Sequence, residues 1–501
     1  MNFAAPLHDG SVWTLVEWLL LVERELLLFA VFWFLVGLAD ELLMDALWFV
    51  LRLDPRRRTP CLADAARDLE LDGRLAVFVA AWREEEVIGT TVAQMLAAWP
   101  TERLVLYVGC YCNDPATVAA ASAAAGQDAR IRLVINPRAG PTTKADCLNR
   151  LFDALRIDEA RRGERYRGVV LHDSEDMVHP LELVLIDRAL AEVDFVQLPV
   201  RPEIPEGPHW IAGHYADEFA DSHARAMVVR DALGAALPAA GVSCGFARDM
   251  LDRIADLRHG GEGEGPFAAD CFTEDYELGM LVKRMGGKSC FLRVRDEDGE
   301  LIGTRSYFPE TLVGAVRQKT RWVHGICLQG WDRLGWNRLD SLGGWVDLWM
   351  MLRDRRGPLG ALVLVAAYVL VLVEGALLVA RLAYGPAMPV LAGGGNGLRI
   401  AMALCAAGAV WRLIMRYVTT AREYGPLEGL LSIARQPLAN IIQIMAGRRA
   451  LFAYIRSLLG ARVVWEKTEH HGHPAQTGRF ALGRRYPGRR IVALAMRKAA
   501  R

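Results

Sequence analysis

The chain has 501 residues, 52% of them hydrophobic, and 59 basic side chains balance 59 acidic ones. This length allows two or three domains, and zero net charge argues against nucleic acid as a partner, because proteins that bind it usually carry a strongly basic domain. Nine cysteines without paired spacing exclude a disulfide framework and favour reduced thiols.

The first 60 residues predict a membrane segment. The apolar run 26–38 and its flanks reach the roughly 20 residues that a bilayer requires. We therefore interpret residues 1–60 as one membrane helix with an amphipathic, interfacial extension. Arginines follow at positions 52, 56, 57 and 58, and the positive-inside bias then places the next part of the chain in the cytoplasm.

Residues 61–335 have the pattern of an α/β domain. Helical, Ala- and Leu-rich segments separate five strand-like runs, which are LAVFVAAW, RLVLYVG, IRLVIN, GVVLHD and DFVQLPV. Such alternation predicts a mostly parallel sheet with helices on both faces. Polar or acidic residues follow four of the runs, at 82–86, 113–114, 140–144 and 173–176. Because the carboxyl ends of parallel strands share one edge of a sheet, these residues predict a nucleotide site there.

The fourth of these strand ends carries the most charge. Val169–Leu171 predicts a buried strand, and Asp173, Glu175 and Asp176 follow it. Three carboxylates so close together repel one another unless a cation lies between them, and oxygen ligands suit Mg²⁺ or Mn²⁺. A solvated turn, or a helix cap formed by Asp176, is the alternative, and this stretch alone does not separate the two.

Residues 336–455 predict amphipathic and transmembrane helices. The run 361–383 is a strong candidate span, and 398–418 is a second, whose arginines lie near its ends and can snorkel. The run 426–445 holds several polar side chains, so we expect an interfacial or re-entrant segment there. The basic tail over 456–501 is expected in the cytoplasm, with solvent or lipid headgroups around it.

Six short motifs stand in order along the chain: Ala80-Ala81-Trp82-Arg83-Glu84, Asn113-Asp114, the run GPTTKADCLN from 140, Asp173-Ser174-Glu175, Thr273-Glu274-Asp275, and Gln318-Lys319-Thr320-Arg321-Trp322. Together they resemble the family 2 glycosyltransferases, in the cellulose-synthase-like membrane branch, over roughly residues 70–330. The resemblance implies a GT-A-like α/β domain flanked by N- and C-terminal membrane helices.

The resemblance implies a nucleotide site at the first strands. Trp82 would stack on uracil, Glu84 would approach the ribose, Asp114 would contact the uridine, and Lys144 would lie near base or phosphate. Trp82, Asp114 and Lys144 each have a simpler alternative, because an aromatic ring at a strand end often only packs, Asp-Pro is a good turn former, and a lysine that opens a helix is commonly exposed. Asp173 belongs to the same nucleotide site.

Asp173 and Glu175 match the family's metal-binding motif, with Glu for the second Asp, so the resemblance implies that they hold Mg²⁺ or Mn²⁺ against a sugar diphosphate. Glu274 and Asp275 match its catalytic motif, and Asp275 would be the base that takes the proton from the acceptor hydroxyl. A helix cap is the alternative for that motif.

Helical spacing places Gln318, Arg321 and Trp322 on one face. By the resemblance, these are catalytic positions, in which Arg321 meets the pyrophosphate and Trp322 stacks on the acceptor sugar. Three further positions resemble the acceptor side of the family, namely Gln197, Ser243 and Cys244.

The HDSED, NDPAT and WEKTEH strings look most like the phage adsorption protein B type within this branch. That type implies a multi-pass protein of a bacterial inner membrane, with its catalytic domain in the cytoplasm, which extends an exported polysaccharide from a UDP-sugar such as a UDP-N-acetylhexosamine. The implied partners are the nucleotide-sugar donor, the growing glycan, membrane lipids, and an outer-membrane export partner or a second copy of the chain. The alternatives are a non-processive transferase to a lipid carrier, and a non-catalytic scaffold for an outer-membrane partner or phage receptor.

Overall fold

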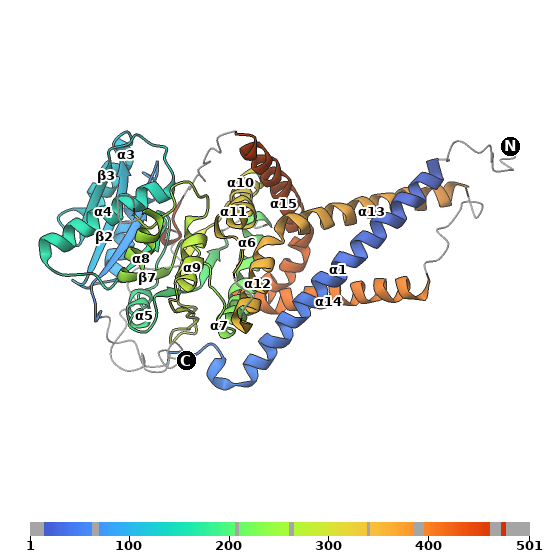
Figure 1. Ribbon diagram of the computed structural model, residues 1–501, viewed down its shortest axis with the longest axis horizontal. Helices are drawn as coiled ribbons and strands as arrows, with labels where there is room; N and C mark the ends of the chain where they lie inside the picture. The colour runs from blue at the N-terminus through green and yellow to red at the C-terminus, as the bar shows by residue number, and fades with distance from the viewer. Residues whose placement is uncertain are drawn as a thin grey trace. The chain divides into compact units, whose positions relative to one another are not determined.

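The computed structural model describes residues 15–62, 70–205, 210–259, 265–337, 341–384, 395–460 and 472–476. The chain divides into a smaller unit, Met1–Leu43 with Leu359–Ile414, and a larger unit, Met44–Pro358 with Met415–Arg501. Figure 1 labels most of their helices and some of their strands. The WEKTEH string and most of the predicted basic tail lie outside the described residues.

The larger unit is built on a seven-stranded sheet with the order β3-β2-β1-β4-β7-β5-β8. Only β7 runs antiparallel to its neighbours, which confirms the predicted, mostly parallel sheet. The strands are β1 (Leu75–Ala80), β2 (Leu104–Tyr111), β3 (Ile131–Asn136), β4 (Gly168–His172), β5 (Phe195–Gln197), β7 (Cys244–Ala247) and β8 (Ser289–Phe291).

The fifth predicted strand is divided between two sheets. Its first half is β5, and its second half continues as β6 (Val200–Glu203), which pairs with β9 (Thr304–Tyr307) in a separate two-stranded sheet. Pro199 lies at the division, and a proline has no N–H with which to continue a sheet ladder. The break therefore lies where the sequence cannot extend β5.

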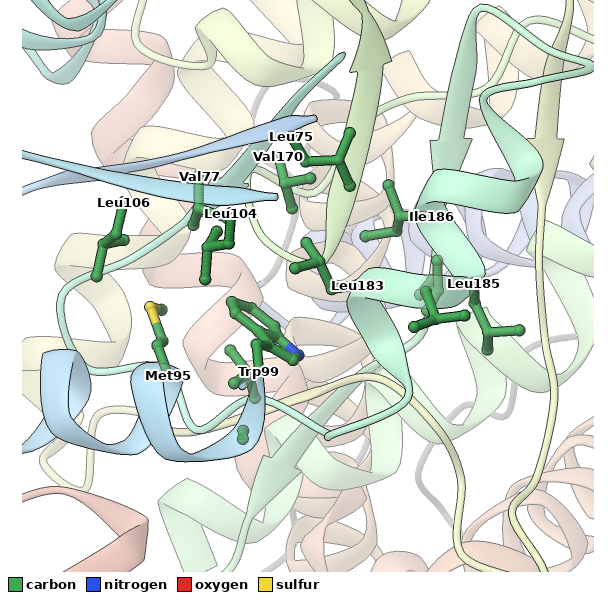
Figure 2. Packing of buried hydrophobic residues seen from close by; sticks show 14 of the residues in the cluster. Leu75, Val77, Met95, Trp99, Leu104, Leu106, Val170, Leu183, Leu185 and Ile186 are labelled. Atoms are coloured by element: carbon green, nitrogen blue, oxygen red, sulfur yellow. The ribbon is translucent and has the colours of Figure 1, made fainter. Parts of the chain in front are cut away.

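Helices cover both faces of the sheet, and the strands alternate between two hydrophobic cores. On one face Leu75, Val77, Leu104 and Leu106 pack with residues of α2 (Ile88–Ala98) and α5 (Glu182–Ala189), as Figure 2 shows. The side chains at the alternate positions of these strands point to the opposite face. They belong to the other core, with residues of α4 (Lys144–Arg162), α8 (Arg248–His259) and α9 (Glu274–Arg284). Burial on both faces explains why these strands are almost continuously apolar.

The remaining helices of the larger unit are α3 (Pro115–Ala125), α6 (Trp210–Asp221), α7 (Met227–Ala232), α10 (Leu312–Trp322), α11 (Gly330–Leu334), α12 (Leu342–Arg355) and α15 (Pro426–Leu458). Its described residues also contain two π-helical segments, η2 (Ser222–Ala226) and η3 (Val323–Gln329), and two 3₁₀ turns, η1 (Pro55–Arg57) and η5 (Pro474–Gln476).

Helix α15 contains the run that we predicted as interfacial or re-entrant. It is one continuous helix, and it packs on α6 and α10. Asp217 of α6 accepts hydrogen bonds from Arg435 of α15 at 2.7 and 2.9 Å, and both side chains are buried. This buried ion pair thus joins α15 to α6 within the larger unit.

Three helices within the described residues are long and apolar enough to cross a membrane: α1 (Leu15–Leu53), α13 (Gly357–Tyr384) and α14 (Asn396–Tyr424). They contain the three runs that the sequence predicts as spans. In the smaller unit Gly408 of α14 lies so close to Leu38 of α1 that a side chain at 408 would overlap it. Small residues commonly allow such close approach between membrane helices.

Candidate functional site

A cavity of about 320 Å³ opens in the larger unit where β1, β2 and β4 end. Three parallel strands deliver their carboxyl-terminal residues to it, while α9 contributes its first turn and α10 its last. The predicted site residues that line the cavity are Trp82, Glu84, Lys144, Asp173, Glu175, Glu274, Asp275, Gln318, Arg321 and Trp322. Residues from five distant parts of the sequence therefore share one cavity.

Trp82 lines the cavity directly after β1. Its ring lies edge-on to Tyr111, with centroids 5.0 Å apart, and closely against Gly140, where a side chain would overlap it. Arg83 adopts a φ of 54°, and its N–H donates to Asp114 Oδ2 at 2.6 Å. Asp114 itself does not line the cavity; it supports the turn that carries the tryptophan.

Lys144 is the first residue of α4, where the Thr143 hydroxyl caps the helix. The Lys144 ammonium forms an ion pair with Asp173 and lies 3.5 Å from the carbonyl oxygen of Gly241. Burial alone would lower the pKa of Lys144, but Asp173, Glu274 and Asp275 raise it above its ordinary value. The lysine therefore stays charged inside the cavity, rather than extending into solvent.

Glu274 and Asp275 open α9. Burial, reinforced by the charge of Asp275, raises the pKa of Glu274 to about 8, and burial also raises the pKa of Asp275. The Asp275 carboxylate accepts the Tyr276 N–H at 2.8 Å and lies against Gly241, whose φ is 76° and whose missing side chain leaves the space. Thr273 holds the N-cap position, but its side chain makes no capping hydrogen bond.

The turn after β4 carries the candidate ligands for a divalent cation. Asp173 and Glu175 line the cavity, whereas buried Asp176 caps no helix and binds His172 Nδ1 at 2.9 Å. In the described part of the chain no three His, Cys, Asp or Glu side chains form a complete metal site. Mg²⁺ beside phosphates commonly takes only one or two protein carboxylates. The residues therefore fit a cation that binds together with a diphosphate.

The last turn of α10 forms part of the cavity wall. Burial lowers the pKa of Arg321, while Asp173, Glu274, Asp275 and Glu175 oppose that shift, so the guanidinium lies within the field of all four carboxylates. Gln318 is on the same face of the helix, and its Oε1 atom is buried without a hydrogen-bond partner. This wall thus offers both charge and a polar group to a ligand.

Trp322 belongs to an aromatic group. Its ring makes edge contacts with Phe219 and Phe308, at centroid distances of 6.2 and 6.4 Å, and all three line the cavity. The Lys319 ammonium lies over the Trp322 ring, 5.7 Å from its centroid. The π-helical segment η3 begins directly after this tryptophan.

Three predicted acceptor residues, Gln197, Ser243 and Cys244, are buried and do not line this cavity. The Gln197 amide donates to the carbonyl oxygen of Val242 at 3.0 Å and accepts the N–H of Ala240 at 2.8 Å. Ala240 and Val242 do line the cavity, so the glutamine shapes its wall from behind.

Several lining residues had no sequence signal of their own. Tyr111 ends β2 as Ala80 ends β1, and its position at a strand end was the one signal that could have identified it. Phe219, Phe272 and Phe308 reach the cavity from a helix and two loops that carry no recognisable motif. Only the packing of α6, α9 and β9 around the cavity brings them there.

The chain was compared with known proteins. The family model "Glycosyltransferase like family 2" matches residues 73–325. Bacteriophage adsorption protein B of Escherichia coli (strain K12) is 32% identical over 485 residues, which cover 92% of this chain and 63% of that protein. The Bacteriophage N4 adsorption protein B of Escherichia coli O157:H7 matches to the same extent. This chain thus spans less than two thirds of the length of these relatives.

Among solved structures, a mannosyltransferase from Pyrobaculum calidifontis in complex with GDP-Man and Mn²⁺ is 15% identical, with a TM-score of 0.48, and the match covers 87% of this chain and 99% of that one. A glucosyl-3-phosphoglycerate synthase from Mycobacterium tuberculosis in complex with Mg²⁺ and UDP is 18% identical, with a TM-score of 0.31, over 51% of this chain and 82% of that one. The family match over residues 73–325, about half of the chain, shows that this chain belongs to glycosyltransferase family 2.

Proposed function

We propose that the protein is a membrane-embedded, inverting glycosyltransferase that transfers a sugar from a UDP-sugar, such as a UDP-N-acetylhexosamine, to a growing, exported polysaccharide. The observation that carries the proposal is that Asp173, Asp275 and Arg321, which are distant in sequence, line one cavity together with Trp82 and Trp322. Family membership supports sugar transfer, and the three apolar helices support a place in the membrane.

In this proposal the donor lies between Trp82 and Arg321. The Trp82 ring lines the cavity and is suited to a base, and Lys144 and Arg321 provide positive charge for a diphosphate. Mg²⁺ or Mn²⁺ held by Asp173 and Glu175 would add positive charge against the leaving diphosphate. Arg321 and Lys144 stabilise the same developing charge from the protein side.

The acceptor in this proposal approaches along the aromatic side of the cavity. The Trp322, Phe219 and Phe308 rings offer apolar faces on which a sugar ring can lie. Asp275 takes the proton from the attacking hydroxyl, and it must be ionised to do so. Its contact with the Gly241 backbone fixes the direction in which the carboxylate faces.

The proposal also covers topology. The domain at residues 61–335 would lie in the cytoplasm, with helices of 1–60 and 336–455 in the inner membrane and the tail 456–501 on the cytoplasmic side. Growing glycan, membrane lipids, and an export partner or a second copy of the chain would be its partners.

The experiment offers detergent-purified protein a panel of UDP-sugars with Mg²⁺ or Mn²⁺ and measures UDP release and product length. We expect Asp275→Asn to lower turnover by about 10²-fold or more, because the variant lacks a group that accepts a proton. Asp270→Asn is the matched control, since this exposed carboxylate lies outside the cavity and should leave turnover unchanged.

An Asp275→Asn variant that released UDP as fast as the parent would contradict the assignment of the base. Product length separates the two enzymatic proposals, because a ladder of oligomers indicates polymer extension and a single-addition lipid product indicates a lipid carrier. A parent without any donor turnover would favour a scaffold.

A further inference from the structure

A segment near the C-terminal end of the described chain reaches the turn that carries Asp173 and Glu175. His473 Nε2 lies 3.1 Å from the carbonyl oxygen of Asp176, across 297 positions of sequence. The His473 side chain is fully buried, and η5, which follows it, contacts α2 and β9. A short segment is thus docked directly behind the proposed metal ligands.

The hydrogen bonds of His473 fix the position of its proton. Nδ1 accepts the N–H of Ala475 at 3.1 Å, so Nδ1 carries no proton. The proton is therefore on Nε2, which donates to the Asp176 carbonyl oxygen. Burial lowers the pKa of His473 and keeps the ring in this neutral form.

One peptide unit is held at both of its polar ends. The Asp176 carbonyl accepts the bond from His473, and the N–H of the same peptide, at Met177, donates to the Arg305 carbonyl at 2.8 Å. Arg305 returns a bond to Met177 at 2.9 Å, which forms an isolated bridge to β9. Two distant segments thus fix the orientation of this peptide plane.

That orientation controls the turn before it. The Asp176 carboxylate accepts the N–H of Asp173 at 3.0 Å and also binds His172. If the 176–177 peptide rotated, the Asp176 backbone and carboxylate would move, and with them the support for the Asp173 backbone. The hydrogen bond of His473 therefore acts on the geometry of Asp173 and Glu175 without touching the cavity.

We infer that His473 is a positioning residue for the cation site: by donating Nε2–H to the Asp176 carbonyl, it holds Asp173 and Glu175 in the arrangement that binds a divalent cation with a nucleoside diphosphate. The inference rests on the proposed function of those two carboxylates. The inference predicts that cation affinity depends on whether the side chain at position 473 can donate a hydrogen bond, and not on how well that side chain packs.

The test compares two variants that separate donor from volume. His473→Phe keeps a ring but has no donor, whereas His473→Gln replaces the ring by an amide that can still donate. Mn²⁺ is titrated into detergent-purified protein with excess UDP, and free Mn²⁺ is followed by electron paramagnetic resonance. We expect His473→Phe to weaken Mn²⁺ binding by about fivefold, the size of one net hydrogen bond, and His473→Gln to restore most of it.

Equal Mn²⁺ affinities in the parent and in His473→Phe would overturn the inference, and so would equal losses in the two variants. If His473→Phe does not fold, the His473→Gln variant alone decides. Because this variant keeps the donor, it should bind Mn²⁺ nearly as tightly as the parent does. A fivefold loss of Mn²⁺ affinity in His473→Gln would overturn the inference. A parent that binds no Mn²⁺ with UDP overturns the proposed metal site, and this inference with it.

Discussion

At the scale of residues, the cavity concentrates negative charge that the protein alone does not neutralise. Two basic side chains, Lys144 and Arg321, share it with five carboxylates, which are Glu84, Asp173, Glu175, Glu274 and Asp275. Burial raises the pKa of Glu274 to about 8, and the charge of Asp275 adds to this shift. Such an arrangement costs stability in the free protein and favours ligands that bring positive charge.

A first prediction concerns the stability of this site in the absence of divalent cations. The pKa of Glu274 is about 8 in the folded protein, against an ordinary value of 4.5. Between these two pH values the Glu274 side chain is protonated in the folded state and ionised in the unfolded state. The contribution of Glu274 to the free energy of unfolding is therefore fully present below pH 4.5 and is lost as the pH rises towards 8. We expect Glu274→Gln to melt at a higher temperature than the parent, by a margin that grows from pH 5 to pH 8.

The control lies on the same helix. Although burial acts in the opposite direction, the hydrogen bond from Arg333 lowers the pKa of Glu277, which also pairs with Arg258 at 2.8 Å. Glu277→Gln should therefore melt at a lower temperature than the parent above pH 5. The two melting curves are measured in detergent with a chelator, and a Glu274→Gln margin that does not change with pH would contradict the prediction.

At the scale of elements, the larger unit depends on buried ion pairs that join helices far apart in sequence. Asp217 of α6 binds Arg435 of α15 and also Arg416 of α14, the latter at 3.1 Å. Helix α15 contacts both α6 and α10, and α10 carries Arg321 and Trp322. The position of α15 therefore affects the part of the cavity wall that α10 forms.

We predict that Asp217→Asn destabilises the larger unit by about 3 kcal/mol or more, because it leaves two arginines without their shared, buried carboxylate. Denaturation in detergent measures the loss. Glu164→Gln is the matched control, since the exposed Glu164 pairs with Arg74 at 2.9 Å and should contribute only about 0–1 kcal/mol. Equal effects of the two substitutions would contradict the role of burial.

The elements also show how far the sequence could be interpreted. The strands β1 to β4 were predictable because each is an apolar run bounded by turn residues, whereas β7, β8 and β9 are three or four residues long and leave no such pattern. Motifs at strand and helix ends identified Trp82, Asp173, Asp275 and Arg321 as neighbours. The buried positions of Gln197, Ser243 and Cys244 depend on how β5 and β7 pack, which no local pattern contains.

At the scale of the whole molecule, the proposed topology is testable through cysteines. Cys112 is an exposed thiol in the larger unit. In a variant that keeps Cys112 as its only cysteine, we expect a membrane-impermeant maleimide to label inverted inner-membrane vesicles but not intact spheroplasts. Detergent should make both samples reactive, which controls for the thiol itself. Labelling of intact spheroplasts would place the larger unit outside the cytoplasm.

The docking of residues 472–476 matters for the choice of C-terminal truncations. A version that ended after α15 would retain every side chain of the cavity and all three long apolar helices. It would nevertheless lack the imidazole behind the acidic turn. We therefore expect a truncated protein of this kind to fold but to bind divalent cations more weakly than the 501-residue chain does.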